Sequence, residues 1–501
     1  MDINEIQKRL KWVPTGILSA AERTLKRIPR FKVMIEKEYD EMLGGMESSL
    51  KPYHKDFTTY SKLPSVGRDR DEIIQEMNAI KAREESRWRD GFVSGAVYNN
   101  DPTFIDFLNQ VYAIHSQSNA LHTDVWPSAS KFEAEVVAMS AHMLGASQTT
   151  DKICGSISSG GTESILLAMK VYRDWARDIK GITHPNIVAP TTAHPAFDKA
   201  GNYFGIQVIR VPVDKNLRAV PAAMKRKINW NTIAMVGTAG TYPHGVIDPI
   251  PELSEIARGH KIGFHTDGCL GGFILPWAEK LGYKVTPFDF RLPGVTSISA
   301  DTHKYGYAAK GTSVVLYRGL ELRHYQYFAA IDWPGGFYTS PTFAGSRSGA
   351  LIAACWAALL STGEEGYLSG AKKIVETTAS IRSSIEAIPE LHLLGDSLFT
   401  AAFASDELNI YDVMDFMGSR GWSLNPLQKP AGIHLSVTLR HTQPGVSERF
   451  IADLKAAIIH VKAHPSEHGN SAPLYGTAAT LPMRGLVTDL LKRYMDLLSK
   501  I

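Results

Sequence analysis

The chain has 501 residues, of which 44% are hydrophobic and 21% are charged, and its formal net charge is +3. This composition is typical of a globular protein with two or three packed units, and so weak a charge argues against nucleic acid as the main partner. The longest apolar run, residues 349–360, is too short to span a bilayer.

Residues 1–60 have the charged pattern of helices. Between Arg23 and Lys32 the sequence carries basic side chains and no acidic one. Such a stretch could contact an anionic membrane, but a solvated helix face or an arm that clasps a second subunit is the more common outcome of this pattern. We therefore expect a helical segment, or dimerisation arm, over residues 1–115.

From about residue 116 short β-branched runs alternate with helical stretches. Strands are expected at residues 187–189, 206–213, 232–236, 261–265, 296–299 and 312–317, and helices near 195–204, 219–228 and 251–258. This alternation predicts an α/β domain with a mainly parallel sheet covered on both faces. In such sheets ligands bind at the carboxyl ends of the strands.

After about residue 345 the pattern changes. Long helical stretches at residues 347–361, 367–387 and 447–463 flank short strands near 399–404 and 432–438. This pattern predicts a smaller C-terminal α+β domain. The expected domains are therefore residues 1–115, 116–345 and 346–501.

A glycine-containing loop, Ser158 to Ser164, precedes a helical stretch at residues 165–177. Glycines let the backbone approach an anion closely, and free N–H groups at the start of a helix bind phosphate. Taken alone, a Gly-Gly-Thr sequence before a helix is more often a capped turn.

An acidic residue, Asp267, follows the expected strand at residues 261–265. A carboxylate in this position could bind a metal, cap a helix or serve a cofactor, and the cap is the commonest of the three. A buried aspartate can also keep a pyridine nitrogen protonated, which makes the ring a stronger electron sink.

A lysine, Lys304, follows the strand at residues 296–299 in the string SADTHKYG. Most lysines lie on the surface, but here His303, Gly306 and a second lysine, Lys310, crowd the amine. Desolvation and a neighbouring cation would lower the pKa of that amine, as an imine-forming lysine requires.

The order of these features is more specific than any one of them. A phosphate loop, then His194, then Asp267, then Lys304 is similar to the large domain of fold-type I enzymes that use pyridoxal 5′-phosphate. That domain needs a phosphate cup, a ring over the pyridine, an acid at the ring nitrogen and a lysine at the aldehyde.

Five longer segments resemble the sphingosine-1-phosphate lyase family, whose wider relatives are the group II decarboxylases. They are SGGTESILLA, PHGVIDPIPE, GVTSISADTHKYGYAAKG, GSRSGALIAACWAAL and GWSLNPLQ. The resemblance runs from about residue 93 to residue 475. It implies a retro-aldol cleavage of a phosphorylated long-chain base to a fatty aldehyde and phosphoethanolamine.

The resemblance also implies roles for individual residues. Lys304 would form the Schiff base with the cofactor, Asp267 would face the pyridine nitrogen and His194 would stack on the ring. The other cofactor contacts would be Gly161, Thr162, His303 and, from the neighbouring subunit of an obligate homodimer, Ser346. The substrate-side positions would be Tyr98, His122, Tyr242, Lys310 and Tyr475.

The chain departs from the family pattern at three positions near these residues. Gly268 stands where alanine is common, Ala309 where proline is common, and Thr123 where proline is common. Membrane-bound members have an N-terminal transmembrane helix, which this sequence lacks. Three widely spaced cysteines, Cys154, Cys269 and Cys355, indicate reduced thiols and no zinc site, so we expect a cytoplasmic enzyme without a metal.

Two alternatives stay open at this point. An amino-acid decarboxylase would use the same cofactor, and a non-catalytic binder of lipid phosphates could keep the fold, although a pure binder would not need Lys304. Within the lyase hypothesis, Lys310 could transfer a proton or only support the phosphate electrostatically.

Overall fold

The computed structural model of the chain describes residues 24, 28–465 and 484–501. The described residues form two compact units. The first comprises those within residues 1–86, 428–431 and 464–501, and the second comprises residues 87–427 and 432–463. The domain boundaries expected at residues 115 and 345 stay predictions.

The first unit contains three described helices, α3 (Pro29–Leu50), α4 (Arg70–Arg89) and α17 (Arg484–Ser499), of which α4 runs on into the second unit. The hydroxyl of Tyr39 on α3 donates a hydrogen bond to the carbonyl of Leu486 on α17, over 2.8 Å. The helical character expected near the N-terminus is therefore present in α3. Most of the basic stretch between residues 23 and 32 lies outside the described residues.

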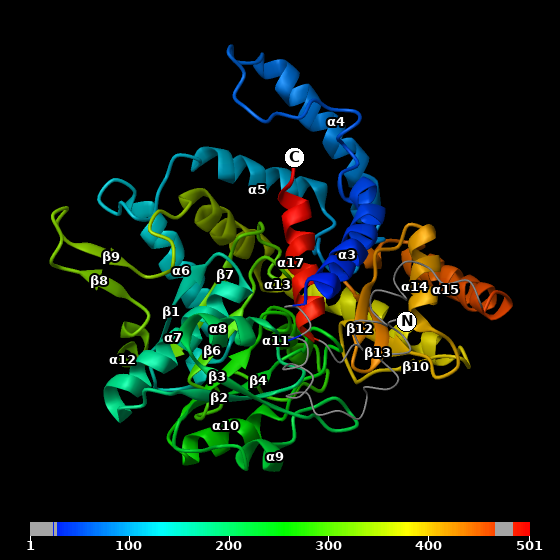
Figure 1. The fold of residues 1–501 in the computed structure, drawn as a ribbon. Helices are drawn as coiled ribbons and strands as arrows, with labels where there is room; N and C mark the ends of the chain where they lie inside the picture. The colour runs from blue at the N-terminus through cyan, green and yellow to red at the C-terminus, as the bar shows by residue number, and fades with distance from the viewer. Residues whose placement is uncertain (1–23, 25–27, 466–483) are drawn as a thin grey trace. The chain divides into compact units, whose positions relative to one another are not determined.

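The second unit is built on a seven-stranded sheet with the order β1-β7-β6-β5-β4-β2-β3 (Figure 1). The strands are β1 (Ile153–Ser158), β2 (Asn186–Pro190), β3 (Gln207–Val211), β4 (Thr232–Thr238), β5 (Gly263–Asp267), β6 (Ser297–Ala300) and β7 (Ser313–Arg318). Strand β7 is antiparallel to both of its neighbours, and every other pairing is parallel. The mainly parallel sheet expected from the sequence is confirmed.

Helices pack on the sheet with their apolar faces, which buries both these faces and the strands. The helices of this region are α5 (Pro102–Ile114), α6 (Pro127–Met143), η1 (Ala146–Gln148), α7 (Gly161–Lys180), α8 (Ala196–Phe204), α9 (Pro221–Lys225), α10 (Ile250–Gly259), α11 (Leu275–Lys280) and α12 (Leu320–His324). Every residue of β4 and β5 is buried, as in a sheet covered on both faces. Tyr172 of α7 is fully buried, and its hydroxyl donates to the carbonyl of Phe264.

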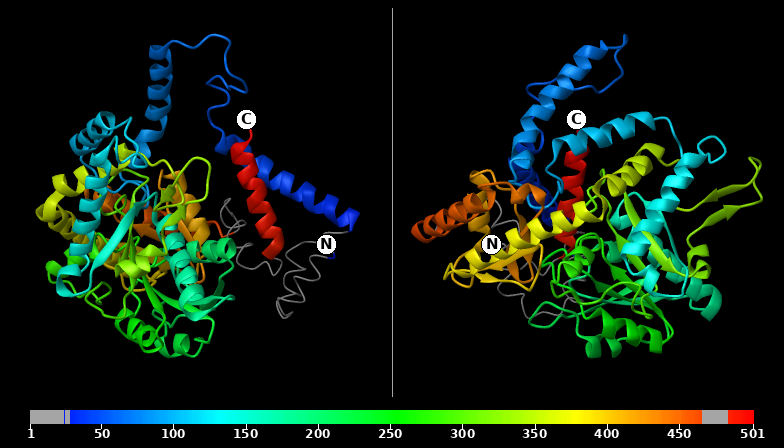
Figure 2. Two further views of the ribbon diagram at one scale, coloured as in Figure 1. Left: turned by 90° about the vertical axis from the view of Figure 1, so that its left-hand side faces the viewer. Right: turned by 180° about the vertical axis from the view of Figure 1, so that it is seen from behind.

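A small sheet and long helices follow in the C-terminal part of the second unit (Figure 2). Helix α13 (Gly349–Glu386) contains the two helices expected at residues 347–361 and 367–387, joined across a kink at Gly363, where φ is 56°. The small sheet has the order β10-β11-β13-β12, with β10 (His392–Leu393), β11 (Thr400–Ala404), β12 (Asn425–Gln428) and β13 (Ala431–Ser436). Helices α14 (Ile410–Ser419) and α15 (Val446–Ala463) accompany it.

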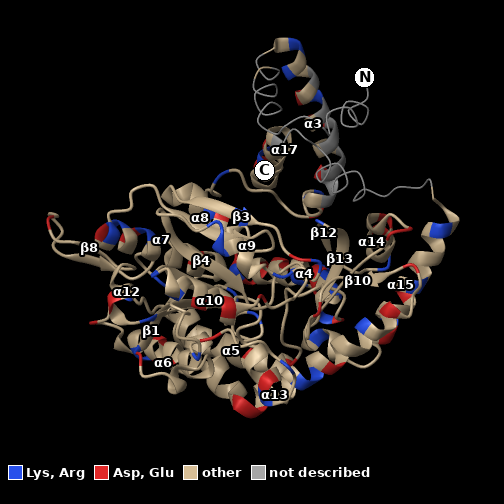
Figure 3. Ribbon diagram, turned by 90° about the horizontal axis from the view of Figure 1, so that it is seen from below, with Lys and Arg blue, Asp and Glu red and all other residues tan. Residues whose placement is uncertain are grey.

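A two-stranded hairpin, β8 (Phe328–Ala330) and β9 (Tyr338–Ser340), projects from the second unit (Figure 1). Its connecting loop exposes large apolar side chains, with Phe337 84% and Ile331 78% accessible. Elsewhere Lys and Arg are interspersed with Asp and Glu, for example along α15 (Figure 3). No described helix has both the length and the apolar character that a membrane-spanning segment requires.

Candidate active site

The predicted site residues meet at one edge of the sheet. Asp267 ends β5, Lys304 follows β6, Gly161 follows β1 and His194 follows β2. These four strands are parallel to one another, so their carboxyl ends share an edge. There the loop at residues 159–163 and the side chains of His194, Asp267, His303 and Lys304 line a cavity of about 350 Å³.

The glycine loop is packed tightly against the rest of the cavity. A Cβ atom on Gly161 would lie 2.7 Å from both Asp301 Oδ1 and Cys269 Sγ, so only glycine fits. The Glu163 carboxylate accepts hydrogen bonds from the backbone N–H groups of Ser159 (2.6 Å) and Phe343 (3.2 Å). The loop therefore presents the start of α7, a 20-residue helix, to the cavity, and such a helix end binds anions.

The carboxylate of Asp267 is buried and held in place. Its Oδ1 atom accepts hydrogen bonds from the N–H of Cys269 (3.0 Å) and the hydroxyl of Ser299 (3.4 Å). Behind it, both ring nitrogens of His265 contact serine hydroxyls, those of Ser297 and Ser299. Burial lowers the pKa of His265 to about 4, so this ring is neutral and acts as a fixed support.

Lys304 forms an ion pair that sequence reasoning missed. Its Nζ atom lies 2.9 Å from Asp301 Oδ2, and Asp301 is only 3% exposed in its side chain. The other oxygen of Asp301 is buried without a hydrogen-bond partner. Asp301 stands three residues before Lys304, and this spacing in the turn after β6 was the available signal.

The expectation that the pKa of Lys304 is lowered is wrong. Burial is the largest single effect and lowers it, but Asp301, Tyr98 and Cys269 together raise the pKa of Lys304 well above its ordinary value. The second lysine of this segment, Lys310, differs in this respect. Burial and the positive charge of Lys304 lower the pKa of Lys310 to about 8.

Two histidines face the cavity in defined orientations. Nδ1 of His194 accepts a hydrogen bond from the N–H of Ala196 over 3.1 Å. Nδ1 of His303 bonds the carbonyl of Thr312, which leaves Nε2 3.8 Å from Asp301 Oδ2. Burial lowers the pKa of both rings, so each is largely neutral near pH 7.

Two of the predicted substrate-side residues adjoin the lysine loop. Lys310 donates a hydrogen bond to the carbonyl of His303 over 3.0 Å, and its Nζ lies 4.9 Å from the centre of the Tyr98 ring. Burial raises the pKa of Tyr98 to about 12, so its hydroxyl keeps its proton and can donate. Tyr242 lines the cavity beside His194, with ring centres 6.3 Å apart.

Three predicted residues are not brought to this cavity within one chain. His122 is exposed and packs edge-on against Trp126. Ser346 is also exposed, and its hydroxyl accepts a hydrogen bond from Asn119 over 3.0 Å. Tyr475 lies outside the described residues.

The cavity fits pyridoxal 5′-phosphate. A helix start, the hydroxyl of Thr162 and the ring of His303 can bind a phosphate, Asp267 can pair with a pyridine nitrogen, and Lys304 supplies the amine for an aldehyde. The cofactor prediction therefore agrees with the chemistry of the lining residues.

Comparisons with known proteins identify the family to which the chain is similar in sequence. Residues 58–401 match the pyridoxal-dependent decarboxylase conserved domain. A sphingosine-1-phosphate lyase of Oryza sativa subsp. japonica is 45% identical over 489 residues, which cover 96% of this chain and 89% of that protein.

Solved structures agree with the sequence comparison. The structure of a sphingosine-1-phosphate lyase from Burkholderia pseudomallei superposes with a TM-score of 0.83 at 42% identity, over 90% of this chain and 99% of that one. A glutamate decarboxylase from Lactobacillus brevis superposes with a TM-score of 0.69 at 21% identity, over 83% of this chain and 97% of that one, and shows the shared fold alone.

Proposed function

This chain belongs to the sphingosine-1-phosphate lyases, and we propose that it cleaves a phosphorylated long-chain amino alcohol between C2 and C3. The chain is a lyase that depends on pyridoxal 5′-phosphate. The observation that carries the residue assignment is the convergence of Lys304, Asp267 and the glycine loop on one cavity.

The cofactor, when bound, supplies an electron sink for the pair of electrons left on C2. Lys304 would hold its aldehyde group and Asp267 would keep the proton on its ring nitrogen, while His194 would lie against the ring. The C3 hydroxyl loses its proton, the C2–C3 bond breaks, C3 leaves as a fatty aldehyde and C2 takes a proton to give phosphoethanolamine. Lys304 is the amine placed to deliver that proton.

The substrate phosphate needs cations and hydrogen-bond donors. Within one chain Lys310 and Tyr98 supply both, because the amine of Lys310 rests on the Tyr98 ring and the Tyr98 hydroxyl keeps its proton. Tyr242 lines the cofactor cavity and is a third donor. We assign Lys310 to phosphate binding and not to proton transfer, since its two contacts favour the charged amine.

A homodimer would complete the site. His122 and Ser346 are exposed and lie outside the cavity of their own chain. The β8–β9 hairpin, which precedes Ser346 in the sequence, exposes Ile331, Trp333 and Phe337, and exposed apolar side chains of this kind are typical of a protein interface. We therefore assign His122 and Ser346 to the active site of a second copy of this chain.

The three cysteines are free and buried, which supports a reducing compartment such as the cytoplasm. Tyr475 lies outside the described residues, so its role as a substrate contact stays a prediction from the family resemblance.

Product identification tests the function. The holoenzyme is incubated with sphingosine 1-phosphate and, separately, with glutamate and with aromatic amino acids, and the products are measured by mass spectrometry. We expect a long-chain aldehyde and phosphoethanolamine from the first and no CO₂ from the others. Release of CO₂ without aldehyde would establish the decarboxylase alternative.

The variant Lys304→Ala tests whether the protein is a lyase or only binds lipid phosphates. It should lose aldehyde production and the absorbance band of the lysine-bound cofactor near about 420 nm. Lys372→Ala, which removes an exposed lysine on α13, is the matched control and should keep both. Unchanged aldehyde production by Lys304→Ala would refute the mechanism.

A further inference from the structure

A buried histidine of the small sheet contacts the loop that carries Tyr242. His434 lies in β13 and is fully buried. Its Nδ1 atom lies 2.9 Å from the carbonyl oxygen of Pro243, and its ring centre lies 5.0 Å from that of Tyr242, with the two ring planes at 75°. Tyr242 in turn lines the cofactor cavity beside His194. A side chain that does not itself line this cavity therefore contacts two consecutive residues of a loop that does.

The hydrogen bonds of this ring define which nitrogen carries its proton. A carbonyl oxygen only accepts, so the Nδ1 atom of His434 donates to Pro243, and in a neutral ring the Nε2 atom is then an acceptor. The amide of Asn425 supplies the matching donor, with its nitrogen 2.9 Å from Nε2. The same amide nitrogen lies 2.8 Å from the hydroxyl oxygen of Ser94, which also accepts from the N–H of Ser436. Both ring nitrogens are therefore bonded, and the ring is held in one orientation.

The base of the same loop is anchored on the large sheet. The N–H of Ala239, just after β4, donates to the carbonyl of Asp267 over 2.8 Å. Residues 241–246 then form a turn, in which the N–H of the first residue donates to the carbonyl of the last over 2.8 Å. These backbone bonds fix where the loop begins and ends, beside the residue expected to face the pyridine nitrogen. The side chain of Tyr242, at the tip, is oriented by its own contacts, among them the ring of His434.

We propose that His434 is a positioning residue of the active site. Its bond to Pro243 holds the tip of the loop, and its ring packs edge to face with the Tyr242 ring, so that the Tyr242 hydroxyl is kept at the cofactor cavity. Tyr242 is 45% exposed, and a contact that holds a half-exposed ring in place reduces the entropy cost of ordering it when the substrate binds. The use of this hydroxyl for the substrate phosphate rests on the proposed function, whereas its placement by His434 does not.

Two substitutions separate the bond to Pro243 from the loss of the ring. His434→Asn places an amide nitrogen where Nδ1 was, so this variant can still donate to the Pro243 carbonyl. His434→Gln places the amide nitrogen where Nε2 was and loses that bond. Both variants remove the ring and its contact with Tyr242, so a difference between them measures the bond to Pro243.

The placement of Tyr242 can be measured without the reaction. In holoenzyme labelled with 3-fluorotyrosine, the fluorine NMR resonance of Tyr242 is the one that Tyr242→Phe removes, and its shift between H₂O and D₂O increases with exposure of the ring to solvent. This solvent shift should be larger in His434→Gln than in the wild type, and His434→Asn should lie between them. Val413→Ala, which removes buried methyl groups from α14, controls for a loss of stability and should keep the wild-type value.

Steady-state kinetics of aldehyde release give a second readout. His434→Gln should raise KM about five- to tenfold, the factor for one lost hydrogen bond, and should change kcat by less than about twofold. Tyr242→Phe should have the same effect. Because His434 acts through Tyr242, the double variant should have the KM of Tyr242→Phe alone, within about twofold. Val413→Ala should keep the KM of the wild type.

Two results would overturn the proposal. Effects on KM that multiply in the double variant would show that His434 acts on another part of the site. A wild-type solvent shift in His434→Gln would show that this ring does not place Tyr242. If His434→Gln does not fold, Asn425→Ala, which removes the donor to Nε2 but keeps the ring, takes its place, and a wild-type solvent shift there has the same meaning. The expected solvent shifts without aldehyde from any substrate would refute the proposed reaction and support the role of His434.

Discussion

The carboxylate of Asp301 lies 2.9 Å from the amine of Lys304, and both groups are in the turn that follows β6. The side chain of Asp301 also sets the space available to the glycine loop, because its Oδ1 atom would be 2.7 Å from a Cβ on Gly161. One carboxylate therefore adjoins both the amine that would bind the cofactor aldehyde and the backbone that would bind its phosphate. Asp301 is a positioning residue in this arrangement.

Asp301→Asn should accelerate uptake of the cofactor at neutral pH. Only the neutral amine attacks an aldehyde, and Asp301 raises the pKa of Lys304 while burial lowers it. Without the carboxylate, burial lowers the pKa of Lys304, and the neutral fraction of the amine increases by up to about tenfold for each unit of lowered pKa. The measurement is the rate of pyridoxal 5′-phosphate uptake by cofactor-free enzyme between pH 6 and 10, followed by absorbance.

In this experiment the wild-type rate should still be rising at the highest pH, whereas the rate for Asp301→Asn should level off earlier. Asp174→Asn, which removes a buried carboxylate paired with Lys170 elsewhere in the unit, is the control and should follow the wild type. Identical pH profiles for Asp301→Asn and the wild type would show that the ion pair does not govern the amine.

Lys310 should make substrate binding depend on pH. Its pKa of about 8 means that the amine is charged below this pH and neutral above it. If the charged form binds the substrate phosphate, KM should be constant below about pH 8 and rise up to tenfold per pH unit above it, with little change in kcat. Steady-state kinetics from pH 6.5 to 9.5 measure this.

Lys310→Arg keeps the charge at every pH in this range and should move the rise in KM out of the range. Lys310→Met should have a high KM throughout. A kcat that instead rises through pH 8 in the wild type, and not in Lys310→Arg, would assign proton transfer to this lysine.

Mixing two inactive variants should restore activity if the site is shared between subunits. One chain carries Lys304→Ala, and the other carries both His122→Ala and Ser346→Ala. A mixed dimer then contains one intact site, so random mixing of equal amounts should recover about a quarter of the wild-type activity. The measurement is aldehyde release after the chains are unfolded and refolded together. Complementation would be absent if His122 and Ser346 served the lysine of their own chain.

Acid should destabilise the fold through its buried histidines. Burial lowers the pKa of His244, His265, His434 and His441 to about 4. Between about pH 6.5 and pH 4 the unfolded chain therefore binds more protons than the native chain. The contribution of these rings to the free energy of unfolding is complete above about pH 6.5. It decreases as the pH is lowered, by up to about 1.4 kcal/mol per pH unit for each ring.

One buried acid opposes this trend. Burial raises the pKa of Asp248 to about 6, so the native state gains protons there as pH falls from 6 to 3.8. Four histidines outweigh it, and the free energy of unfolding of the cofactor-free protein, measured in urea at pH 7, 6 and 5, should decrease in that order. His434→Gln should reduce the slope, and a slope of zero in the wild type would contradict the prediction.

The sequence by itself determined the order of the candidate site residues. Each of these residues ends a strand or follows one closely: Gly161, His194, Asp267 and Lys304, in chain order. The carboxyl ends of parallel strands meet at one edge of a sheet. Their meeting in one cavity could therefore be predicted from spacing and hydrophobic pattern. The sequence also predicted most of the strands and the two halves of α13, because buried β-branched runs and long apolar periodicities are local signals.

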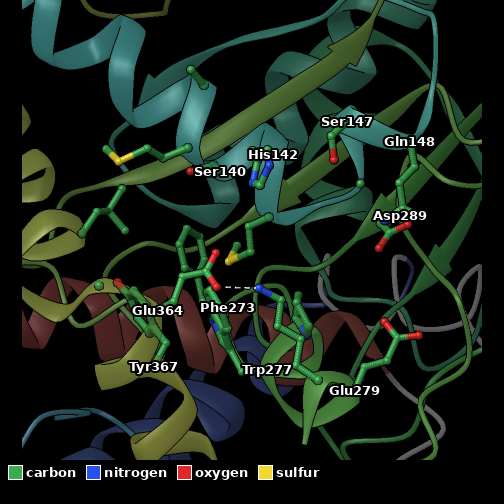
Figure 4. A pocket seen from close by; sticks show the side chains of 18 of the residues that line it. Ser140, His142, Ser147, Gln148, Phe273, Trp277, Glu279, Asp289, Glu364 and Tyr367 are labelled. Carbon is green, nitrogen blue, oxygen red and sulfur yellow. Dashed lines mark hydrogen bonds and ion pairs between the residues drawn. The ribbon is translucent and has the colours of Figure 1, made fainter. Parts of the chain in front are cut away.

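Only the tertiary structure decided the electrostatics of the site and the cavities that the packed helices enclose. The pKa of Lys304 depends on a 2.9 Å contact and on burial, and a one-dimensional pattern contains neither quantity. A cavity of about 800 Å³ is lined by residues of α6, α11 and α13, which are more than a hundred positions apart in places (Figure 4). The local hydrophobic pattern determines where a strand ends. The distance between two side chains depends on the packing of elements that are remote in sequence, and that distance in turn determines their pKa values and charges.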